Sequence, residues 1–369
     1  MPDVSESPPP SADAGPPDGG PSDGGLLTAS FLGLAFTQFL TAVNDNIFRW
    51  LVIGIGKDFY EPQDYGWVLM AGTACFVLPY LLLAAPAGYL ADRFSKRSVI
   101  VGCKVAEVAI MGLGLVAIAL GNFNFLLVVV GLMGAQSALF APSKLGSIPE
   151  MLAARHISAA NGIFGLMTVI ATLVGMVAGN VLSDATGLRG QDHLEWSAAV
   201  LLGVAAAGLL FSLPICKLAV ANPQRPFPWL GPFQTLNDLR VLAGNPALLR
   251  VALGIVFFWS VGALGQLNID QLAYEGGALR EAAKVPLLVA LIVGVGIGSV
   301  LAGIWSGGRV ELGILPLGAG GMALGGILLF TVPEQLFQDG SILTLGCLWA
   351  CVLLFGLGLG AGLFDVPLE

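Results

Sequence analysis

Charged residues are scarce in this chain. Only 11% of its residues are Asp, Glu, Lys or Arg, whereas 56% belong to the group AVILMFWYC. Soluble domains carry roughly a quarter charged residues, so the deficit excludes an ordinary water-soluble domain and indicates a lipid solvent. The apolar runs are continuous and mostly reach about 20 residues, the length of a spanning helix, whereas transmembrane strands alternate over about ten. The sequence therefore predicts an all-α polytopic membrane protein.

Groups that carry catalysis are also few. The chain has two histidines, His156 and His193, and Asn161 follows His156 where the H-x-x-x-x-D of glycerolipid acyltransferases needs Asp. The sequence contains no Walker loop, no metal-ligand cluster and no basic patch suited to nucleic acid. The five cysteines lie in or beside apolar runs, as packing residues do. We expect no enzyme activity, no metal, no cofactor and no nucleic-acid partner.

Residues 1–25 differ from the rest of the chain. They are rich in Pro, Gly, Ser and Asp, and they contain no Lys or Arg. Such a composition buries too little apolar surface to fold, and it lacks the basic start of a signal peptide. The sequence predicts a disordered cytoplasmic tail.

Charge and turn residues divide the remainder into ten candidate helices, since each span needs about 20 apolar residues. The longest interior connection, 220–247, separates a bundle of six helices (26–219) from a second group of four (248–369). We expect this connection to be a cytoplasmic linker. The candidates are 26–56, 66–91, 98–120, 122–142, 157–183, 196–219, 248–273, 285–307, 312–332 and 341–364.

Lys and Arg predict the orientation, because inner loops carry an excess of both. With a cytoplasmic amino terminus, the outer connections hold Lys57, Arg189, Arg280 and Lys284, and Arg49 lies within the first helix. The inner side holds Arg93, Lys96, Arg97, Lys104, Lys144, Arg155, Lys217, Arg225, Arg240, Arg250 and Arg309. This bias predicts a cytoplasmic amino terminus.

Features of the first half recur 215–225 residues later. "NDN" at 44–46 is echoed by "NID" at 268–270, "GYLADRFSKR" at 88–97 faintly by "GIWSGGRVEL" at 303–312, and "GAQSALFAP" at 134–142 by "GLGAGLFDVP" at 358–367. Three echoes in one order indicate an internal repeat. Two six-helix halves related by a repeat are the architecture of major facilitator transporters.

The stretch "PAGYLADRFSKR" resembles the loop signature of the major facilitator superfamily, G-x-L-A-D-R-x-G-R-[KR]. We expect the glycine to allow close packing, the aspartate to face the positive end of a helix, and the cations to hold the loop at the cytoplasmic face. Ser95 stands where the pattern has glycine, and Lys96 where it has arginine. The matching positions are Gly88, Leu90, Ala91, Asp92, Arg93 and Arg97.

Further motifs resemble the bacterial lysophospholipid transporter family: "FLTAVNDNIFR", "ALFAPSKLGSIPE", "SAANG" at 158–162 and the final "GLFDVPLE". The resemblance covers about 30–369. It implies flipping of lysophospholipids across the bacterial inner membrane for re-acylation, by a protein that stands alone or is fused to an acyltransferase and acyl-ACP synthetase. The alternatives are efflux of hydrophobic small molecules, as in macrolide-efflux-like transporters, and a membrane anchor for a fused lipid-remodelling enzyme.

Two features depart from that family. Its transporters have twelve helices, whereas this chain stops near the end of the tenth, so we expect a fragment with about ten of the twelve. The long acidic tail before Leu26 is not part of the usual pattern either.

The first expected helix carries the candidate substrate or coupling site. An ionisable group at membrane depth costs about 2.5–3.5 kcal/mol on insertion scales and therefore usually faces a cavity or a partner. Asp45 is predicted to anchor the ammonium of a phosphoethanolamine-type headgroup or to be a protonatable coupling site. A salt bridge with Arg49 at i,i+4 is the structural alternative. Asn44 and Asn46 either bond to a headgroup or tie the helix to its neighbours.

The second half repeats this polar character. Asp270, Asn268 and Gln266 lie in the corresponding helix, and we expect them to face the same midplane cavity. Asp270 lies nearer the outer end, which leaves a solvated mouth as the alternative.

Other ionisable residues are candidates for gating. Lys104 and Glu107 are spaced i,i+3 and are expected to pair within their helix. Lys144 and Glu150 lie at the cytoplasmic end of the fourth helix. Lys144 is expected to snorkel to the interface, with a lipid phosphate contact as the alternative.

The fifth expected helix contains a G-x-x-x-G pattern, Gly175 and Gly179, which predicts close helix packing. The proline-containing glycine motif of drug/proton antiporters is absent from this helix, which disfavours drug antiport.

Overall fold

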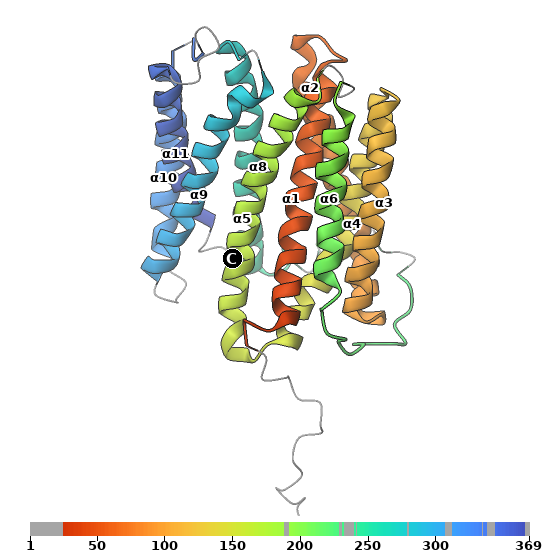
Figure 1. Ribbon diagram of the computed structural model, residues 1–369. Coiled ribbons are helices and arrows are strands. Elements are labelled where there is room, and N and C mark those ends of the chain that lie inside the picture. Colours follow the sequence, from red (N-terminus) through yellow and green to blue (C-terminus); the bar gives the residue numbers. More distant parts are fainter. Residues whose placement is uncertain are drawn as a thin grey trace, which may run out of the picture.

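The computed structural model describes residues 25–187, 192–228, 231, 240, 242–278, 280–306, 312–333, 335–337 and 344–365. Within these ranges the chain forms ten long α-helices, short 3-10 turns and no strand (Figure 1). Residues 1–24 of the predicted tail and residues 229–230, 232–239 and 241 of the predicted linker lie outside the described residues.

The first six long helices correspond to the predicted first bundle, and they run alternately between two ends of the molecule (Figure 1). We name these ends after residues that flank α1, the Thr28 end and the Lys57 end. The helices are α1 (Ala29–Lys57), α2 (Tyr65–Arg93), α3 (Lys96–Ala119), α4 (Phe123–Met151), α5 (Ala154–Ala185) and α6 (Leu194–Ser212).

The four later helices lie to one side of this group, next to α5 (Figure 1). They are α8 (Pro246–Glu275), α9 (Val285–Ser306), α10 (Leu315–Leu328) and α11 (Leu345–Asp365). A 3-10 turn, η3 (Glu281–Lys284), precedes α9 at the Lys57 end. All ten predicted segments are therefore helical.

Two predicted boundaries are wrong, and proline is involved in both. The prediction ended the fourth helix at 142, but α4 continues to Met151 with Pro142 and Pro149 inside it. Membrane helices tolerate proline because neighbouring groups satisfy the freed carbonyls. The prediction extended the sixth helix to 219, whereas α6 ends at Ser212 with Leu213 as its cap. Leu213 keeps α dihedral angles, and Pro214 follows with no backbone N–H to continue the helical hydrogen bonds.

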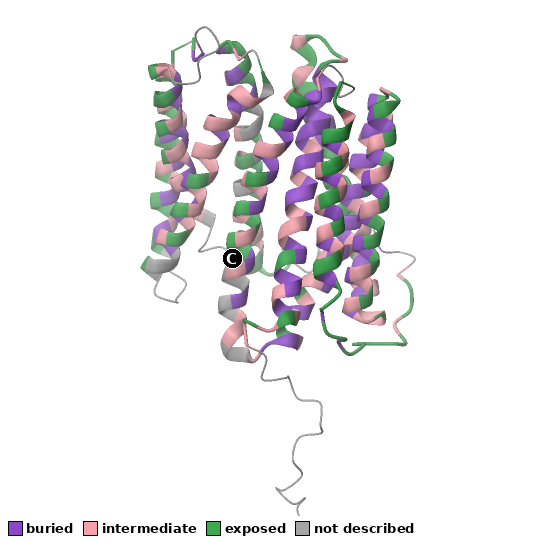
Figure 2. Cartoon of the chain, in the orientation of Figure 1, coloured by how far each residue is buried: buried purple, intermediate pink, exposed green. Residues whose placement is uncertain are grey.

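Helix α1 is the centre of the first half. It is buried along most of its length, whereas α3 and α10 carry exposed faces (Figure 2). Its contact with α5 depends on the predicted glycine pair: a Cβ at Gly175 would lie 2.6 Å from the Asn46 Cβ, and one at Gly179 would lie 2.7 Å from the Ile47 carbonyl oxygen. The packing role predicted for this motif is confirmed.

The two groups of helices meet at the Lys57 end. One apolar cluster joins them there, and its larger members are Trp50, Ile53, Leu69 and Met176 from the first group and Ile269, Leu287, Leu288, Leu336, Phe337 and Leu354 from the second. Tyr65 on α2 packs edge-on against Tyr274 on α8, with ring centroids 5.4 Å apart. The Asp184 carboxylate at the end of α5 accepts a hydrogen bond from the Ala282 N–H of η3 at 2.8 Å.

Seven described helices are long and apolar enough to cross a membrane: α2, α3, α4, α5, α6, α9 and α11. Helices α8 and α10 contain shorter apolar segments. Helix α1 is outside both sets although it lies at the centre of the first half, because polar and charged residues interrupt its apolar sequence. The chain is a multi-pass membrane protein.

Candidate functional site

Asp45 lies near the middle of α1 and is 7% exposed. Its Oδ2 accepts a hydrogen bond from the Ser137 hydroxyl of α4 at 2.6 Å. Its Oδ1 is buried and has no hydrogen-bond partner among the described residues. A buried carboxylate oxygen without a partner costs free energy that a donor group can recover. Asp45 therefore has the geometry of a binding residue with one oxygen held and one oxygen open.

The predicted Asp45–Arg49 salt bridge, the structural alternative for this site, does not form within the described chain. Arg49 instead donates to the Asn46 Oδ1 at 3.0 Å, and its guanidinium lies 5.7 Å from the Phe76 ring centroid. Asn46 in turn donates to the Ala42 carbonyl at 2.8 Å. Four residues separate Asp45 from Arg49, a rise of about 6 Å along α1. The two charges are neighbours that do not neutralise each other by direct contact.

Asn44 has a structural role. Its Nδ2 donates to the Glu107 Oε1 of α3 at 3.0 Å. Glu107 forms an ion pair with Lys104, and Lys104 also donates to the Thr41 hydroxyl at 2.9 Å. The predicted pairing of Lys104 with Glu107 is confirmed, and both side chains are fully buried. This network ties α1 to α3, so Asn44 makes an inter-helix contact. Its buried Oδ1 has no hydrogen-bond partner among the described residues, and its role toward a headgroup stays a prediction.

Lys144 does not snorkel toward a membrane interface as the sequence suggested. Its Nζ donates to the Gln38 Oε1 of α1 at 2.8 Å and lies 5.7 Å from the Phe140 ring centroid. The Gln38 Nε2 in turn donates a hydrogen bond to the Thr168 hydroxyl of α5 at 3.1 Å. The side chain stays inside because an amide oxygen and an aromatic face are within its reach. Lys144 thus links α4, α1 and α5, two turns of α4 from Ser137.

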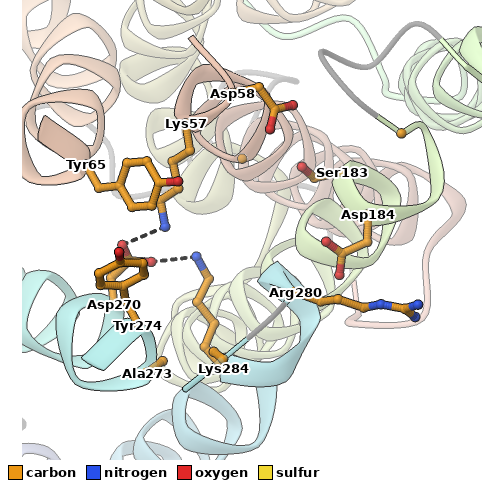
Figure 3. A pocket seen from close by; sticks show the side chains of 13 residues that line it. Lys57, Asp58, Tyr65, Ser183, Asp184, Asp270, Ala273, Tyr274, Arg280 and Lys284 are labelled. Carbon is orange, nitrogen blue, oxygen red and sulfur yellow. Dashed lines mark hydrogen bonds and ion pairs between the residues drawn. The ribbon is translucent and has the colours of Figure 1, made fainter. Parts of the chain in front are cut away.

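Asp270 is in a different place from the predicted midplane cavity. It lies at the Lys57 end, where one carboxylate oxygen accepts from Lys57 at 2.7 Å and the other from Lys284 at 2.6 Å. All three side chains are at most 7% exposed. Figure 3 shows the two lysines pointing at the carboxylate from opposite sides. We call this group the ion lock, because Lys57 belongs to α1 whereas Asp270 and Lys284 belong to α8 and η3.

A pocket of about 480 Å³ adjoins the ion lock. It is lined from both groups of helices, by Lys57, Asp58, Tyr65, Ser183, Asp184, Asp270, Tyr274, Arg280 and Lys284 among others (Figure 3). Asp270 is buried in contact with two cations, so the solvated mouth that was the alternative for this residue is also wrong.

Asn268 does not share the position of Asp270. Its side chain is exposed and donates to the Leu264 carbonyl of its own helix at 2.8 Å. The predicted grouping of the two in one cavity is therefore wrong, because residues two positions apart on a helix face different directions. The side chain of Gln266 lies outside the described residues.

The loop that carries the family signature contacts the segment after α6. Asp92 pairs with Arg225, whose guanidinium also reaches the Gly88 carbonyl at 3.4 Å. Arg93 donates to the Arg225 carbonyl at 2.8 Å, and Arg97 donates to the Leu213 carbonyl at 2.9 Å. Asp92 was expected to face a helix end; its observed partner is a cation instead.

Two other expectations for this loop are resolved. A Cβ at Gly88 would meet nothing within 4 Å, so close packing does not explain this glycine. Lys96 at the start of α3 pairs with Glu150 near the end of α4. Glu150 and Lys96 therefore join two helices at the Thr28 end, and Lys144 is not part of that contact.

Sequence reasoning missed Ser137, Gln38, Lys57 and Lys284. Ser137 and Gln38 are uncharged residues in apolar runs, and only the fold shows which of them faces Asp45 or Lys144. The two lysines were assigned to outer connections from their positions at helix ends. The sequence feature that could have predicted a partner for the two lysines is Asp270, a single carboxylate near the same end of the membrane-spanning region.

The chain matches the Major Facilitator Superfamily over residues 34–368. It therefore belongs to that superfamily: it is a transporter with the major facilitator fold, not an enzyme.

Several relatives of the chain are named as the lysophospholipid transporter LplT. It is 27% identical over 347 residues to the lysophospholipid transporter LplT of Serratia proteamaculans (strain 568), which covers 93% of this chain and 80% of the relative. It is 29% identical over 252 residues to LplT of Cronobacter sakazakii (strain ATCC BAA-894), with 67% and 58% covered. It is 27% identical to LplT of Pectobacterium carotovorum subsp. carotovorum (strain PC1), with 93% and 78% covered.

Solved structures with this fold include a bacterial homologue of the human lysosomal transporter Spinster in an inward-facing, unoccupied conformation. The TM-score is 0.65 at 17% identity, and the match covers 92% of this chain and 74% of that one. The occupied, inward-facing form of the homologue gives a TM-score of 0.63 at 16% identity, with 92% and 73% covered. These matches establish the fold.

Proposed function

We propose that the chain moves lysophospholipids across the bacterial inner membrane as a secondary transporter. Its relatives named as lysophospholipid transporters align with most of its length. A transported lipid needs a polar site for its headgroup inside an otherwise apolar protein. In the first half, Asp45 and Arg49 supply two charges of opposite sign within the first membrane helix.

The open Asp45 Oδ1 carries this proposal. Ser137 fixes one carboxylate oxygen, which leaves the other buried and without a partner among the described residues. An ammonium group donates up to three hydrogen bonds and carries the complementary charge, so it satisfies this oxygen better than a neutral donor does. The ammonium of a phosphoethanolamine headgroup is therefore the ligand group that we assign to Asp45.

Arg49 suits the phosphate of the same headgroup. Its guanidinium donates one hydrogen bond to Asn46 and presents a planar fork that matches phosphate geometry. The rise of about 6 Å between Asp45 and Arg49 is comparable to the separation of the two charges in a zwitterionic headgroup. A carboxylate with a free oxygen beside a guanidinium selects a zwitterion over a simple cation.

We propose that the amino terminus is cytoplasmic, as the Lys and Arg bias predicts. The Lys57 end is then the outer end, where the two groups of helices are in contact through the ion lock. Substrate exchange at that end needs those contacts to separate, and rocking of the two halves about the Asp45 site gives alternating access.

A lysophospholipid delivered to the inner leaflet is a substrate for re-acylation. We propose that an acyltransferase with an acyl-ACP synthetase consumes the product, either as a separate partner or as a fused domain. The chemistry supports this order, because a free glycerol hydroxyl must be acylated to restore a bilayer-forming lipid.

The test is uptake of labelled lysophosphatidylethanolamine into spheroplasts that express the full chain. We expect uptake by the unaltered protein and a roughly tenfold to hundredfold loss in Asp45→Asn, since a hydrogen bond to a charged group contributes about 1.5–3 kcal/mol. Glu195→Gln is the matched control, because Glu195 is an exposed carboxylate remote from the site.

The control should transport normally. The proposal fails if the unaltered, correctly inserted protein takes up no lysophospholipid, and export of a hydrophobic drug by that protein would point to the small-molecule alternative instead.

A further inference from the structure

A second cavity of about 480 Å³ lies in the first half, away from the ion lock. It is formed where the end of α2 meets α3 and α4, and α3 lies on the side of the molecule opposite α8–α11 (Figure 1). Leu132 and Phe94 at its margin are 41% and 46% exposed, so the cavity opens on the outer surface of the membrane-spanning helices. Its lining is Leu90, Phe94, Ser98, Val99, Gly102, Cys103, Ala106, Ile110, Leu132, Ala135, Gln136 and Leu139.

Gln136 is the exceptional residue in this lining. The cavity is otherwise almost entirely apolar, yet the Gln136 side chain is 4% exposed and its Nε2 has no hydrogen-bond partner among the described residues. Its Oε1 lies 3.2 Å from the Ser137 hydroxyl. A buried amide group left without a partner costs about 1–3 kcal/mol.

The single Ser137 hydrogen cannot serve two acceptors. The hydroxyl lies 2.6 Å from the Asp45 Oδ2 and 3.2 Å from the Gln136 Oε1, so the carboxylate receives it. If the amide is turned over, its NH₂ donates to Ser137 and its carbonyl oxygen becomes the free end. In either orientation one end of the Gln136 amide remains to bond to a ligand.

An amide both donates and accepts hydrogen bonds, and this combination distinguishes between lipids. A lysophospholipid has an ester carbonyl that accepts and a free glycerol hydroxyl that donates. A diacyl phospholipid has two ester groups, which only accept. The apolar lining has the chemistry to hold an acyl chain beside that glycerol.

We propose that this cavity, which we call the α3–α4 pocket, binds the acyl chain and glycerol of a lysophospholipid, with Gln136 selecting lyso over diacyl lipid. The inference rests on the proposed function and adds a site separate from Asp45. Ser137 joins the two, because it is adjacent to Gln136 in sequence and holds the Asp45 carboxylate. The pocket is a lateral position for a lipid beside the transport site.

The test uses the full chain in lipid nanodiscs and a lysophosphatidylethanolamine that carries a photoreactive diazirine in its acyl chain. We expect adducts in 98–110 and 132–139, and competition by unlabelled lysophosphatidylethanolamine roughly twofold to tenfold more effective than by the diacyl lipid, since one hydrogen bond to a ligand is worth about 0.5–1.5 kcal/mol. Adducts spread evenly over exposed helix faces, or equal competition by both lipids, would mean ordinary bilayer lipid only and overturn the proposal.

A matched pair of glycine variants tests the place of binding. Gly102 lines the pocket and a Cβ there meets nothing within 4 Å, so Gly102→Phe adds a ring at the pocket from an uncrowded position. Gly112 is on the same helix, also has open space around a Cβ, and is not in the lining. Gly102→Phe should reduce the adducts at least about fivefold, whereas Gly112→Phe should leave them unchanged; equal effects would contradict the assignment.

Gln136→Met tests the selecting residue, because it keeps the length of the side chain and removes its hydrogen-bonding groups. The variant should retain crosslinking but lose the preference for lyso over diacyl lipid. Retention of the preference would exclude Gln136 as its source.

The Asp45→Asn variant separates the two proposals. We expect it to lose uptake while it keeps the adducts in the α3–α4 pocket. Uptake with no pocket adducts would overturn the pocket alone, and pocket adducts with no uptake by the unaltered protein would overturn the transport assignment alone.

Discussion

Asp45 and Asp270 are the two carboxylates of the echoed motifs, and they have opposite environments. Within the described residues Asp45 has one hydrogen-bond partner, Ser137 of the first half, and one oxygen without a partner. Both carboxylate oxygens of Asp270 form ion pairs with lysines, and the pair with Lys57 connects the two halves. A carboxylate with a free oxygen suits ligand binding, whereas a carboxylate saturated by two cations suits a structural contact. The same residue type in repeated motifs therefore has two different roles.

The register of the repeat explains the difference. At the offset of 224 residues that relates "NDN" to "NID", Asp45 corresponds to Ile269 and Asp270 to Asn46. One position rotates a side chain by about 100° around a helix. Depth differs as well: Asp45 is 12 residues from the last residue of α1 (57 − 45), and Asp270 is 5 from the last residue of α8 (275 − 270). Asp270 therefore lies nearer the end of its helix.

The largest effect on stability is expected in the first half at Glu107, a carboxylate with a partner on each oxygen. Lys104→Met leaves Glu107 fully buried without its cation, and breaking a buried pair in this way costs about 3–5 kcal/mol. We expect a large fall in the thermal unfolding temperature of the purified protein. The double variant Lys104→Met/Glu107→Leu removes both charges and should recover most of the loss; no recovery would show that the lysine stabilises the fold by packing alone.

The second prediction breaks the ion lock. Asp270→Asn removes the charge that holds two lysines, and it should favour separation of the halves at the Lys57 end. A cysteine at Ser183, a buried residue in the lining of the adjoining pocket, reports this opening through its maleimide labelling rate. We expect a rise of at least about tenfold, because breaking a buried pair costs about 3–5 kcal/mol and about 1.4 kcal/mol suffices for that factor.

Peptide mapping distinguishes this cysteine from the exposed Cys216. An unchanged labelling rate in Asp270→Asn would mean that the lock does not hold the halves together.

The third prediction separates the two lysines of the lock. Lys57 connects the halves, whereas Lys284 and Asp270 belong to the same half. Lys57→Met should therefore raise Ser183→Cys labelling several-fold more than Lys284→Met does. Equal increases would indicate that the net charge of the ion lock, and not the contact between Lys57 and Asp270, controls the opening.

The smallest effect is expected from the aromatic contact beside the lock. Tyr65 and Tyr274 pack edge-on between the halves, and such pairs contribute about 0.5–1.5 kcal/mol. Tyr274→Leu should raise labelling of Ser183→Cys by roughly twofold to tenfold. A larger increase than that of Asp270→Asn would reverse the relative importance of the ionic and aromatic contacts.

Much of the fold could be predicted because lipid imposes a simple pattern. All ten apolar segments are helices, and Gly175 and Gly179 pack as their spacing indicates. The ends of α4 and α6 were wrong because proline acts differently inside a membrane helix and at its boundary. Spacing within one helix also gave the Lys104–Glu107 pair correctly.

Contacts between helices could not be predicted in the same way. Asp45 and Asp270 stood out as charges in apolar runs, but their partners Ser137, Lys57 and Lys284 come from distant segments. One sequence gives the rotation of each helix about its own axis only through its apolar stripe, and a buried helix such as α1 is apolar on several faces. The choice between a ligand site and an ion lock therefore required the structure.

The polar character of α1 has a consequence for how the protein is made. This helix emerges from the ribosome before the others, yet it is outside the group of helices apolar enough to cross a membrane by composition. Each charge at its centre costs about 2.5–3.5 kcal/mol on insertion scales, and its buried polar contacts include groups from α3, α4 and α5. We expect α1 to remain at the insertion machinery until those helices arrive, so that the helix with the proposed substrate site enters the bilayer as part of a group.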